Sequence, residues 1–417
     1  MAVAVTIFVI ALVAIASERV DRTKVALAGA ALVVVTQTID QEHAIEAVDF
    51  NTIGLLAGMM LMVKLTETTG VYTYLAIRAG QISRGRSLAV TASLALTTAV
   101  LSAFLDNLTT VLLMVPITFL LADALDVDPI PLVIIEIIAS NIGGTATLIG
   151  DPPNIIIAGA TGLSFSEFIV NLAPIAALAF IVVTPLLYLA YRPRLRVAPD
   201  ARERVMELDA ERSIEDRDEL KRTVPILVGT IVLFFVHKAV GLEPATVALA
   251  GATVMLLVTR QSLEKALAGI EWPTLFFFIG LFVMVGALEE TGAIAEVANA
   301  LGDLTGGNRS AELLGITWLS ALGSGVVDNI PFTATMIPVV EQLQGAGGDD
   351  AYWWALAMGA CFGGNATIIA AAANVAASGM AARAGQPISF VTFLKAGLPA
   401  TALSMVLATG YLVVRYL

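Results

Sequence analysis

The chain has 417 residues, of which 58% are hydrophobic and only 14% are charged. Soluble domains are nearer to about 45–50% apolar and about 25% charged, so this composition excludes an ordinary soluble enzyme. Together with a mean hydropathy of +0.86, it predicts a polytopic helical membrane protein that has the lipid bilayer as a partner.

The charged, cysteine and histidine residues exclude several further classes. The net charge of −12 argues against nucleic acid as a partner. One cysteine, Cys361, and two histidines, His43 and His237, cannot build a cysteine-rich or conventional zinc centre. The sequence has no P-loop motif, and nothing in it indicates a catalytic triad. We therefore expect no enzyme activity, no cofactor and no metal site.

Apolar runs follow one another along the first half of the chain. They lie near residues 3–18, 25–37, 52–66, 87–105, 109–122, 131–142, 153–160 and 168–191. A helix needs about 20 residues to cross a bilayer, and several of these runs are shorter. We predict a re-entrant hairpin over 87–122 with its tip at Asp106, and one crossing over 131–160 that is broken after Gly144.

A charged segment follows these runs. Residues 192–222 hold nine Lys or Arg and nine Asp or Glu in 31 positions. We predict a solvated linker over 196–222 that has no chemistry of its own. It separates a first repeat, residues 1–195, from a second repeat, residues 223–417.

The second repeat copies the first in sequence. Residues 25–30 recur letter for letter at 247–252, which is an offset of 222 residues. The Asp-Asn pair at Asp106 recurs at Asp328 with the same offset, and the paired glycines at 143 recur at 363 with an offset of 220. We therefore predict a second hairpin at about 310–342 and a second broken helix at 353–378.

The distribution of positive charge predicts the topology. With five crossings per repeat and the amino terminus outside, 20 of the 23 Lys and Arg residues lie on the cytoplasmic side. The positive-inside rule favours this arrangement, which places the linker in the cytoplasm and the protein in the plasma (inner) membrane. An odd number of crossings makes the two repeats inverted, a plan typical of secondary transporters with a substrate near the midplane.

The predicted hairpin tips carry polar side chains at membrane depth. Each tip precedes a half-helix, whose free N–H groups and positive dipole end favour polar or anionic groups. We predict that the substrate is bound by Asn107, Thr109, Thr110, Asn329 and Thr333. Asp106 and Asp328 are predicted to bind a coupling ion or proton. An alternative is that these two aspartates only cap the half-helices.

The predicted helix breaks offer further ligands. Paired glycines let a helix unwind, and the freed carbonyl, amide and hydroxyl groups can bind a small hydroxylated or ionic solute. The predicted binding residues are Gly143, Gly144, Thr145, Thr147 and Asn154 in the first repeat and Gly363, Gly364, Asn365, Thr367 and Asn374 in the second. The alternative is a packing kink without a ligand.

Two acids occur in the first repeat alone. Asp151 has Ala371 as its counterpart, and Glu136 has Leu356, both at the offset of 220. The shared fold does not demand these acids, so we predict that they hold the coupling proton or sodium ion. The alternative for Asp151 is a cap on the half-helix that starts at Pro152.

These motifs resemble the ion transporter superfamily over nearly the whole chain. The resemblance rests on Asp106-Asn107-x-Thr-Thr-Val with Pro116 and on the run from Asn141 to Asn154. The run from Asp328 to Pro338 resembles the branch that holds ArsB-like arsenite efflux permeases and the P protein. The resemblance implies two inverted repeats that move substrate by alternating access. It also implies exchange of trivalent arsenite or antimonite for protons, in some members with a separate cytoplasmic ATPase.

Three functions remain open from the sequence. The first is proton-coupled efflux of arsenite or antimonite, and the second is a Na⁺/H⁺ antiporter. The third is a citrate or dicarboxylate symporter, which the Asp106 and Asp328 tips disfavour because those families carry Ser-Asn-Thr there and because carboxylates repel. The expected partners are a small inorganic solute with a proton or sodium ion. A cytoplasmic ATPase and a second copy of the chain, in a homodimer, are open alternatives.

Overall fold

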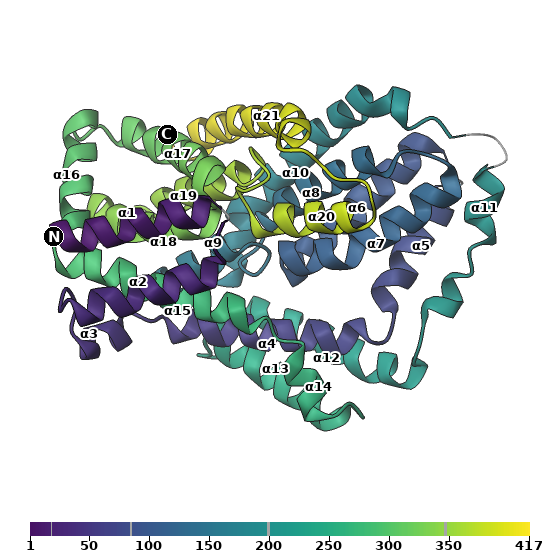
Figure 1. Ribbon diagram of the computed structural model, residues 1–417, viewed down its shortest axis with the longest axis horizontal. Coiled ribbons are helices and arrows are strands. Elements are labelled where there is room, and N and C mark those ends of the chain that lie inside the picture. The colour runs from purple at the N-terminus through teal and green to yellow at the C-terminus, as the bar shows by residue number, and fades with distance from the viewer. Residues whose placement is uncertain (18, 84–85, 198–200, 346–347) are drawn as a thin grey trace.

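The computed structural model describes residues 1–17, 19–83, 86–197, 201–345 and 348–417, and this part of the chain contains helices and no strand (Figure 1). Residues 198–200 of the predicted linker lie outside it. Seven helices in these ranges are long and apolar enough to cross a membrane, and α1, α8 and α13 are shorter apolar helices. The prediction of an all-α polytopic membrane protein is confirmed.

The two halves of the chain contain the same series of ten α-helices. The first series is α1 (Ala2–Ala16), α2 (Arg22–Val35), α3 (Gln41–Glu46), α4 (Phe50–Glu67), α5 (Val71–Ile82), α6 (Ser87–Leu105), α7 (Asn107–Leu125), α8 (Pro129–Gly144), α9 (Pro152–Thr161) and α10 (Phe165–Tyr191). The second is α12 (Arg217–Val236), α13 (Pro244–Val258), α14 (Leu263–Ala268), α15 (Trp272–Glu290), α16 (Ala293–Thr305), α17 (Arg309–Val327), α18 (Asn329–Gln344), α19 (Ala351–Gly363), α20 (Ala372–Arg383) and α21 (Phe390–Tyr416). Short helices η1 (Arg192–Arg194), α11 (Ala201–Glu207) and η2 (Ala210–Ser213) lie between the series.

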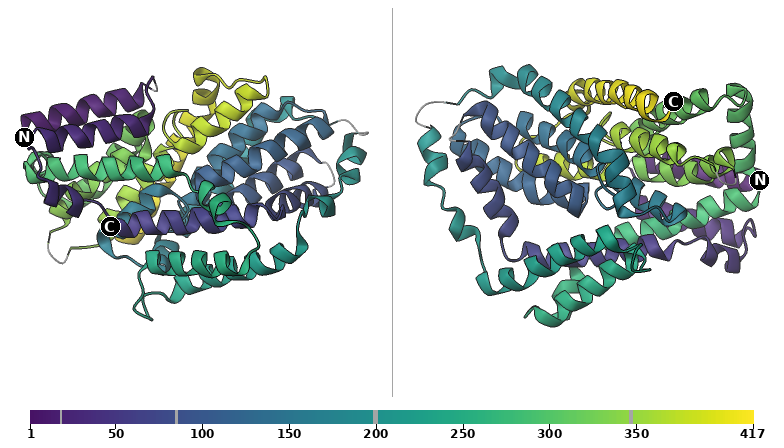
Figure 2. Two further views of the ribbon diagram at one scale, coloured as in Figure 1. Left: turned by 60° about the horizontal axis from the view of Figure 1, so that its bottom comes forward. Right: turned by 180° about the vertical axis from the view of Figure 1, so that it is seen from behind.

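The two repeats contact each other through exchanged partners. Helix α2 packs on α15 of the other repeat, and its counterpart α13 packs on α4 (Figures 1 and 2). A Cβ added at Gly58 would lie 2.8 Å from the backbone of Ala248, and one added at Gly280 would lie 2.7 Å from that of Ala26. These two close approaches are equivalent positions, so the same packing occurs twice across the repeat interface.

Helices α6 and α7 fold back on each other as a hairpin. Val90 and Leu94, near the start of α6, share a buried apolar cluster with Met114 and Leu121 of α7. Helix α5 closes this cluster with Ile77. Each arm has 19 residues, so the arms are as long as full spans. The length of the arms therefore does not determine where the tip lies. Its position depends on the contacts that the hairpin makes with the broken helices, such as those of α7 with α8 and α20.

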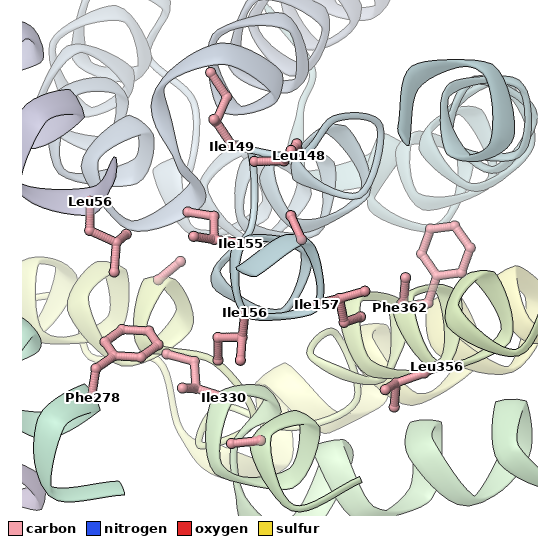
Figure 3. Packing of buried hydrophobic residues seen from close by; sticks show 14 of the residues in the cluster. Leu56, Leu148, Ile149, Ile155, Ile156, Ile157, Phe278, Ile330, Leu356 and Phe362 are labelled. Atoms are coloured by element: carbon pink, nitrogen blue, oxygen red, sulfur yellow. The ribbon is translucent and has the colours of Figure 1, made fainter. Parts of the chain in front are cut away.

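The apolar core surrounds the half-helix α9 (Figure 3). Ile155, Ile156 and Ile157 of α9 are buried, and α9 contacts α4, α18 and α19. Leu56, Phe278, Ile330, Leu356 and Phe362 belong to the same cluster and come from both repeats. In the same way α20 contacts α7 and α8. Each half-helix is thus seated in the opposite repeat, which brings the two helix breaks together.

Candidate functional site

Both hairpin tips are sharp turns at an aspartate with an unusual backbone. Asp106 has φ 112° and ψ 156°, and Asp328 has φ 131° and ψ 139°. Residues other than glycine rarely adopt this region of backbone φ and ψ, and holding a residue there costs about 1–3 kcal/mol. Strain of this size is retained where the surrounding structure fixes the backbone, and the two positions are equivalent in the repeats.

The two aspartates cap the helices that follow them. Asp106 Oδ1 accepts a hydrogen bond from the Thr109 backbone N–H at 2.8 Å, and its Oδ2 accepts one from the Thr109 hydroxyl at 2.7 Å. Asp328 Oδ1 accepts one from the Ile330 N–H at 2.9 Å. Both carboxylates therefore cap these helices, and their binding of a coupling ion or proton stays a prediction. Asp328 also forms an ion pair with Arg22 at 3.4 Å, and the second repeat has Pro244 in the place of Arg22.

Each helix break is held by an asparagine of its own repeat. Asn154 Nδ2 donates to the carbonyl oxygens of Thr145 at 3.2 Å and Thr147 at 2.8 Å. Asn374 Nδ2 donates to those of Gly364 at 2.7 Å and Thr367 at 2.8 Å. These amides satisfy carbonyls that the unwound backbone leaves free, so they stabilise the shape of the break.

The breaks are also joined to the hairpin arms of their own repeats. The hydroxyl of Thr147 donates to the Ala103 carbonyl, and that of Thr367 donates to the Gly325 carbonyl at 2.7 Å. A Cβ at Gly143 would lie 2.2 Å from the carbonyl oxygen of Ala99. The equivalent distance at Gly363 is 2.6 Å, to Ala321. The glycines thus permit close approach of the arms, and none of the four break glycines, Gly143, Gly144, Gly363 and Gly364, has positive φ.

Asp151 lies where the two hairpin tips meet. Its Oδ1 accepts a hydrogen bond from Asn107 Nδ2 at 3.1 Å and from Asn329 Nδ2 at 3.1 Å. Its Oδ2 is buried and has no hydrogen-bond partner in the described part of the chain. The side chain makes no capping bond to α9, so the capping alternative for Asp151 is wrong. Asn107 and Asn329 are 222 residues apart and therefore equivalent, so two symmetric groups share one carboxylate oxygen.

Asn141 connects this centre to the second repeat. Its Nδ2 donates to Asn374 Oδ1 at 2.9 Å and to Asn365 Oδ1 at 3.0 Å, and its Oδ1 accepts from Asn107 Nδ2 at 3.1 Å. We call Asn107, Asn141, Asn329, Asn365 and Asn374 with Asp151 the asparagine cluster. All six residues are buried.

Asn141 is not among the site residues predicted from the sequence. The signal was present, because Asn141 begins the repeated break motif on a helix whose other residues are almost all apolar. Its counterpart Cys361 donates to Asn154 Oδ1 at 3.5 Å. The Asn141–Asn374 and Cys361–Asn154 contacts are equivalent, so each helix break receives a side chain from the opposite repeat.

The threonines of the predicted site are placed differently from one another. Thr333 donates to the Asn329 carbonyl at 2.6 Å, and Thr145 donates to the Asn141 carbonyl at 2.8 Å. The Thr110 hydroxyl is buried without a partner among the described residues, as is Asn365 Nδ2. Together with Asp151 Oδ2, these two atoms have free hydrogen-bonding capacity.

Glu136 forms a separate buried site. Its Oε1 accepts a hydrogen bond from the Thr118 hydroxyl at 2.6 Å, and its Oε2 has no partner in the ranges described. It lies one and a half turns before Asn141 on α8, which is about 7.5 Å along the helix axis. The structure therefore groups Asp151, but not Glu136, with the hairpin tips.

Two cavities between the repeats are lined by equivalent residues. The wide cavity has a volume of about 470 Å³ and is lined by Asp49, Gly286, Glu289 and Ala334, among others. The narrow cavity has about 130 Å³ and is lined by the counterparts Glu271, Lys64, Glu67 and Leu112, together with Thr109. Lys64 stands where the wide cavity has Gly286, and its side chain packs over Gly269.

A further cavity of about 400 Å³ reaches the second hairpin tip. It is lined by Arg22, Asp328, Leu108 and residues of α1 and α20. Outside the cavities, Asp40, His43 and Glu290 place possible metal-ligand atoms within 4.8 Å of one another. All three are exposed, whereas the residues of the asparagine cluster are buried.

Two hairpin tips that meet two broken helices at a buried carboxylate, inside an inverted repeat, define a secondary transporter. The citrate transporter family model, CitMHS, matches residues 12–359, and the chain belongs to this family. An uncharacterised transporter of Mycobacterium bovis is 45% identical over 99% of this chain and 98% of its own length. The mouse P protein is 33% identical over 96% of this chain, which covers 58% of that protein.

A solved structure supports the fold. The YdaH transporter of Alcanivorax borkumensis superposes with a TM-score of 0.58 over 88% of this chain and 85% of its own, at 16% identity. This likeness concerns the fold alone. The family and these relatives confirm the expected resemblance to the ion transporter superfamily and make the chain an integral membrane transporter.

Proposed function

We propose that the protein couples the movement of protons to the efflux of trivalent arsenite or antimonite. Transport proceeds by alternating access at the asparagine cluster between the hairpin tips and the helix breaks. The observation that carries the proposal is the convergence of Asn107 and Asn329 on Asp151 Oδ1. A carboxylate that accepts hydrogen bonds from both repeats is a group whose contacts change when the repeats move against each other.

Proton coupling follows from the surroundings of Asp151. An ionised carboxylate is costly at membrane depth unless a cation or several donors compensate it. Asp151 accepts hydrogen bonds from only two neutral amides, and no Lys, Arg or His forms an ion pair with it among the described residues. The negative charge of an ionised Asp151 therefore has no counter-charge. Asp151 therefore carries a proton when the site closes without solute, and a solute whose hydroxyl group donates to Asp151 Oδ2 takes the place of that proton.

The acids of the site favour a substrate without negative charge. Asp106, Asp328 and Asp151 are all buried, and like charges in a partly dry site repel a polycarboxylate. Citrate, from which the family takes its name, fits this arrangement poorly. As(OH)₃ and Sb(OH)₃ are neutral, and their hydroxyl groups can donate to Asp151 Oδ2 and accept from Asn365 Nδ2 or Thr110.

A Na⁺/H⁺ antiporter is the second candidate, and the wide cavity favours it. Four acids line that cavity, namely Glu46, Asp49, Glu289 and Glu341, and its described lining residues include no Lys, Arg or His. A cavity of this charge concentrates cations and repels anions.

The proposal also places the protein in the plasma membrane with its amino terminus outside and its linker in the cytoplasm.

Proteoliposomes with an imposed pH gradient test the proposal. Arsenite, antimonite, sodium and citrate are offered separately, and proton movement is followed with a pH-sensitive dye. Proton movement driven by arsenite or antimonite supports the metalloid antiporter. Movement driven by sodium alone overturns that substrate in favour of the second candidate, and movement driven by citrate overturns the argument from charge.

A further inference from the structure

The place where the hairpin tips meet has the features of a carboxylate receptor. Asn107 Nδ2 and Asn329 Nδ2 both lie 3.1 Å from the same oxygen atom. Two convergent N–H donors on one oxygen are an arrangement that recognises an anion. These side chains are the first residues of α7 and α18, so two helix amino termini with their positive dipole ends also point to this place.

The carboxylate in this receptor comes from one repeat alone. Asp151 belongs to the break of the first repeat, and Ala371 occupies the equivalent position in the second. The asparagine donor, by contrast, is present in both repeats, as Asn107 in the first and as Asn329 in the second. Each repeat therefore supplies one donor of the receptor, and only the first repeat supplies the carboxylate.

We infer that Asp151 is a specificity-determining residue, because it fills a small-carboxylate site between the hairpin tips with the chain's own carboxylate. A side chain attached to the backbone at this point competes with any free anion at a very high effective concentration. Anionic solutes are thereby excluded from the centre. The inference rests on the proposed function only in taking the asparagine cluster as the transport site.

The second repeat has the uncharged residue Ala371 at the position equivalent to Asp151, and this suggests the variant that tests the inference. Asp151→Ala copies Ala371 and removes a group the size of formate. Asn329 Nδ2 then loses its acceptor, and Asn107 Nδ2 keeps only its hydrogen bond to Asn141 Oδ1. Formate should enter this vacancy and accept the hydrogen bonds that Asp151 Oδ1 accepts in the native chain. Acetate, which is larger by one methyl group, should bind more weakly.

The experiment measures the apparent Tm of the purified full-length chain with sodium formate and with sodium chloride at equal concentration. We expect formate to raise the Tm of Asp151→Ala in a saturable manner and to increase the yield of folded variant, with no effect on the native chain. Asp151→Asn fills the space and keeps an oxygen for the tip amides, so formate should not affect it.

Two controls separate this site from general effects of an anion. Glu136→Ala also removes a buried carboxylate, but Glu136 accepts no hydrogen bond from a tip amide. Formate should therefore not stabilise this variant. Adding Asn329→Ala to Asp151→Ala should abolish the effect of formate. The inference is overturned if formate raises neither the Tm nor the folded yield of Asp151→Ala, or raises those of Glu136→Ala equally.

The outcome is independent of the proposed function. Formate binding by Asp151→Ala in a protein that shows no proton-coupled transport would leave the receptor in place and refute the proposed function. Proton-coupled transport by the native chain without formate binding by Asp151→Ala would do the reverse.

Discussion

The side chain of Asn141 donates a hydrogen bond to Asn374 Oδ1 at 2.9 Å and so joins the helix break of one repeat to that of the other. The equivalent contact, from Cys361 to Asn154 Oδ1, is 3.5 Å long and is made by a thiol. The two equivalent contacts between the helix breaks are therefore unequal, since an amide is a stronger donor than a thiol. The strong contact also connects to Asn107, and through it to Asp151.

Replacing Asn141 should have a large effect on stability. Asn141→Ala leaves Asn374 Oδ1, Asn365 Oδ1 and one hydrogen of Asn107 without their partner, all of them buried. A buried polar group that loses its partner costs about 1–3 kcal/mol, so we expect a loss of about 3 kcal/mol. The measurement is the apparent Tm of the purified protein.

Cys361→Ala is the matched control for this variant. It removes the equivalent contact, but a thiol is a weak donor, so the loss should be only about 1 kcal/mol. Equal losses for the two variants would mean that the Asn141 bonds are not what holds the breaks together.

The strained backbone at the hairpin tips leads to a prediction with an unusual order of stability. At position 106, alanine loses the cap, worth about 1 kcal/mol, and keeps the strain. Glycine loses the same side chain but relieves a strain of about 1–3 kcal/mol. Asp106→Gly should therefore have a higher apparent Tm than Asp106→Ala.

Position 328 provides an independent repetition, because Asp328 has nearly the same backbone conformation. Asp328→Gly should again be more stable than Asp328→Ala. If alanine were equal to or better than glycine at both positions, the tips would not have the positive φ described for them.

The difference between the narrow and wide cavities should depend on Lys64. Lys64→Gly copies Gly286 and removes the side chain that packs over Gly269, so the narrow cavity should widen. A cysteine at position 109, in a Cys361→Ser background, should then react faster with a water-soluble thiol reagent than it does beside the native lysine.

Ala334→Cys in the wide cavity is the control for that measurement. Its reaction rate should not change with Lys64→Gly, because the wide cavity has glycine at the equivalent position already. An unchanged rate at position 109 would show that Lys64 does not limit access to the first hairpin tip.

Glu136 and Thr118 should behave as a coupled pair. Thr118→Val removes the 2.6 Å hydrogen bond to Glu136 and leaves a buried carboxyl group unsatisfied, at a cost of about 1–3 kcal/mol. Adding Glu136→Leu, which copies Leu356, replaces both polar groups by apolar ones and should restore most of the lost stability. The apparent Tm of the two single variants and the double variant measures the coupling, and strictly additive losses would contradict it.

The internal repeat made much of the fold predictable. The Asp-Asn and Gly-Gly motifs recur at nearly constant offsets, and they lie at the hairpin tips and helix breaks because a polar or glycine-rich interruption cannot continue a buried helix. The two capping aspartates could be anticipated for the same local reason. The strained φ at Asp106 and Asp328 could not, because it depends on how the arms are held.

The contacts across the repeats were beyond the sequence. Whether Asp151 caps α9 or faces the tips depends on how one repeat sits on the other, and hydropathy and motif spacing do not encode that placement. The same holds for the role of Asn141. The sequence predicts that Asn154 and Asn374 bind substrate, but it does not reveal that their amides also hold the carbonyls of their own breaks. Glu136, like Asp151, is an acid with an apolar counterpart in the second repeat, yet it lies away from the asparagine cluster.

The most direct test of the coupling role of Asp151 is proton flux in proteoliposomes made with the native chain, Asp151→Asn and Glu136→Gln. Solute-driven proton flux should be present in the native chain and lost in Asp151→Asn, while solute exchange without a pH gradient persists because the tips keep an acceptor at that position. Glu136→Gln should retain proton flux. Undiminished flux in Asp151→Asn together with its loss in Glu136→Gln would contradict the assignment of Asp151 as the proton carrier.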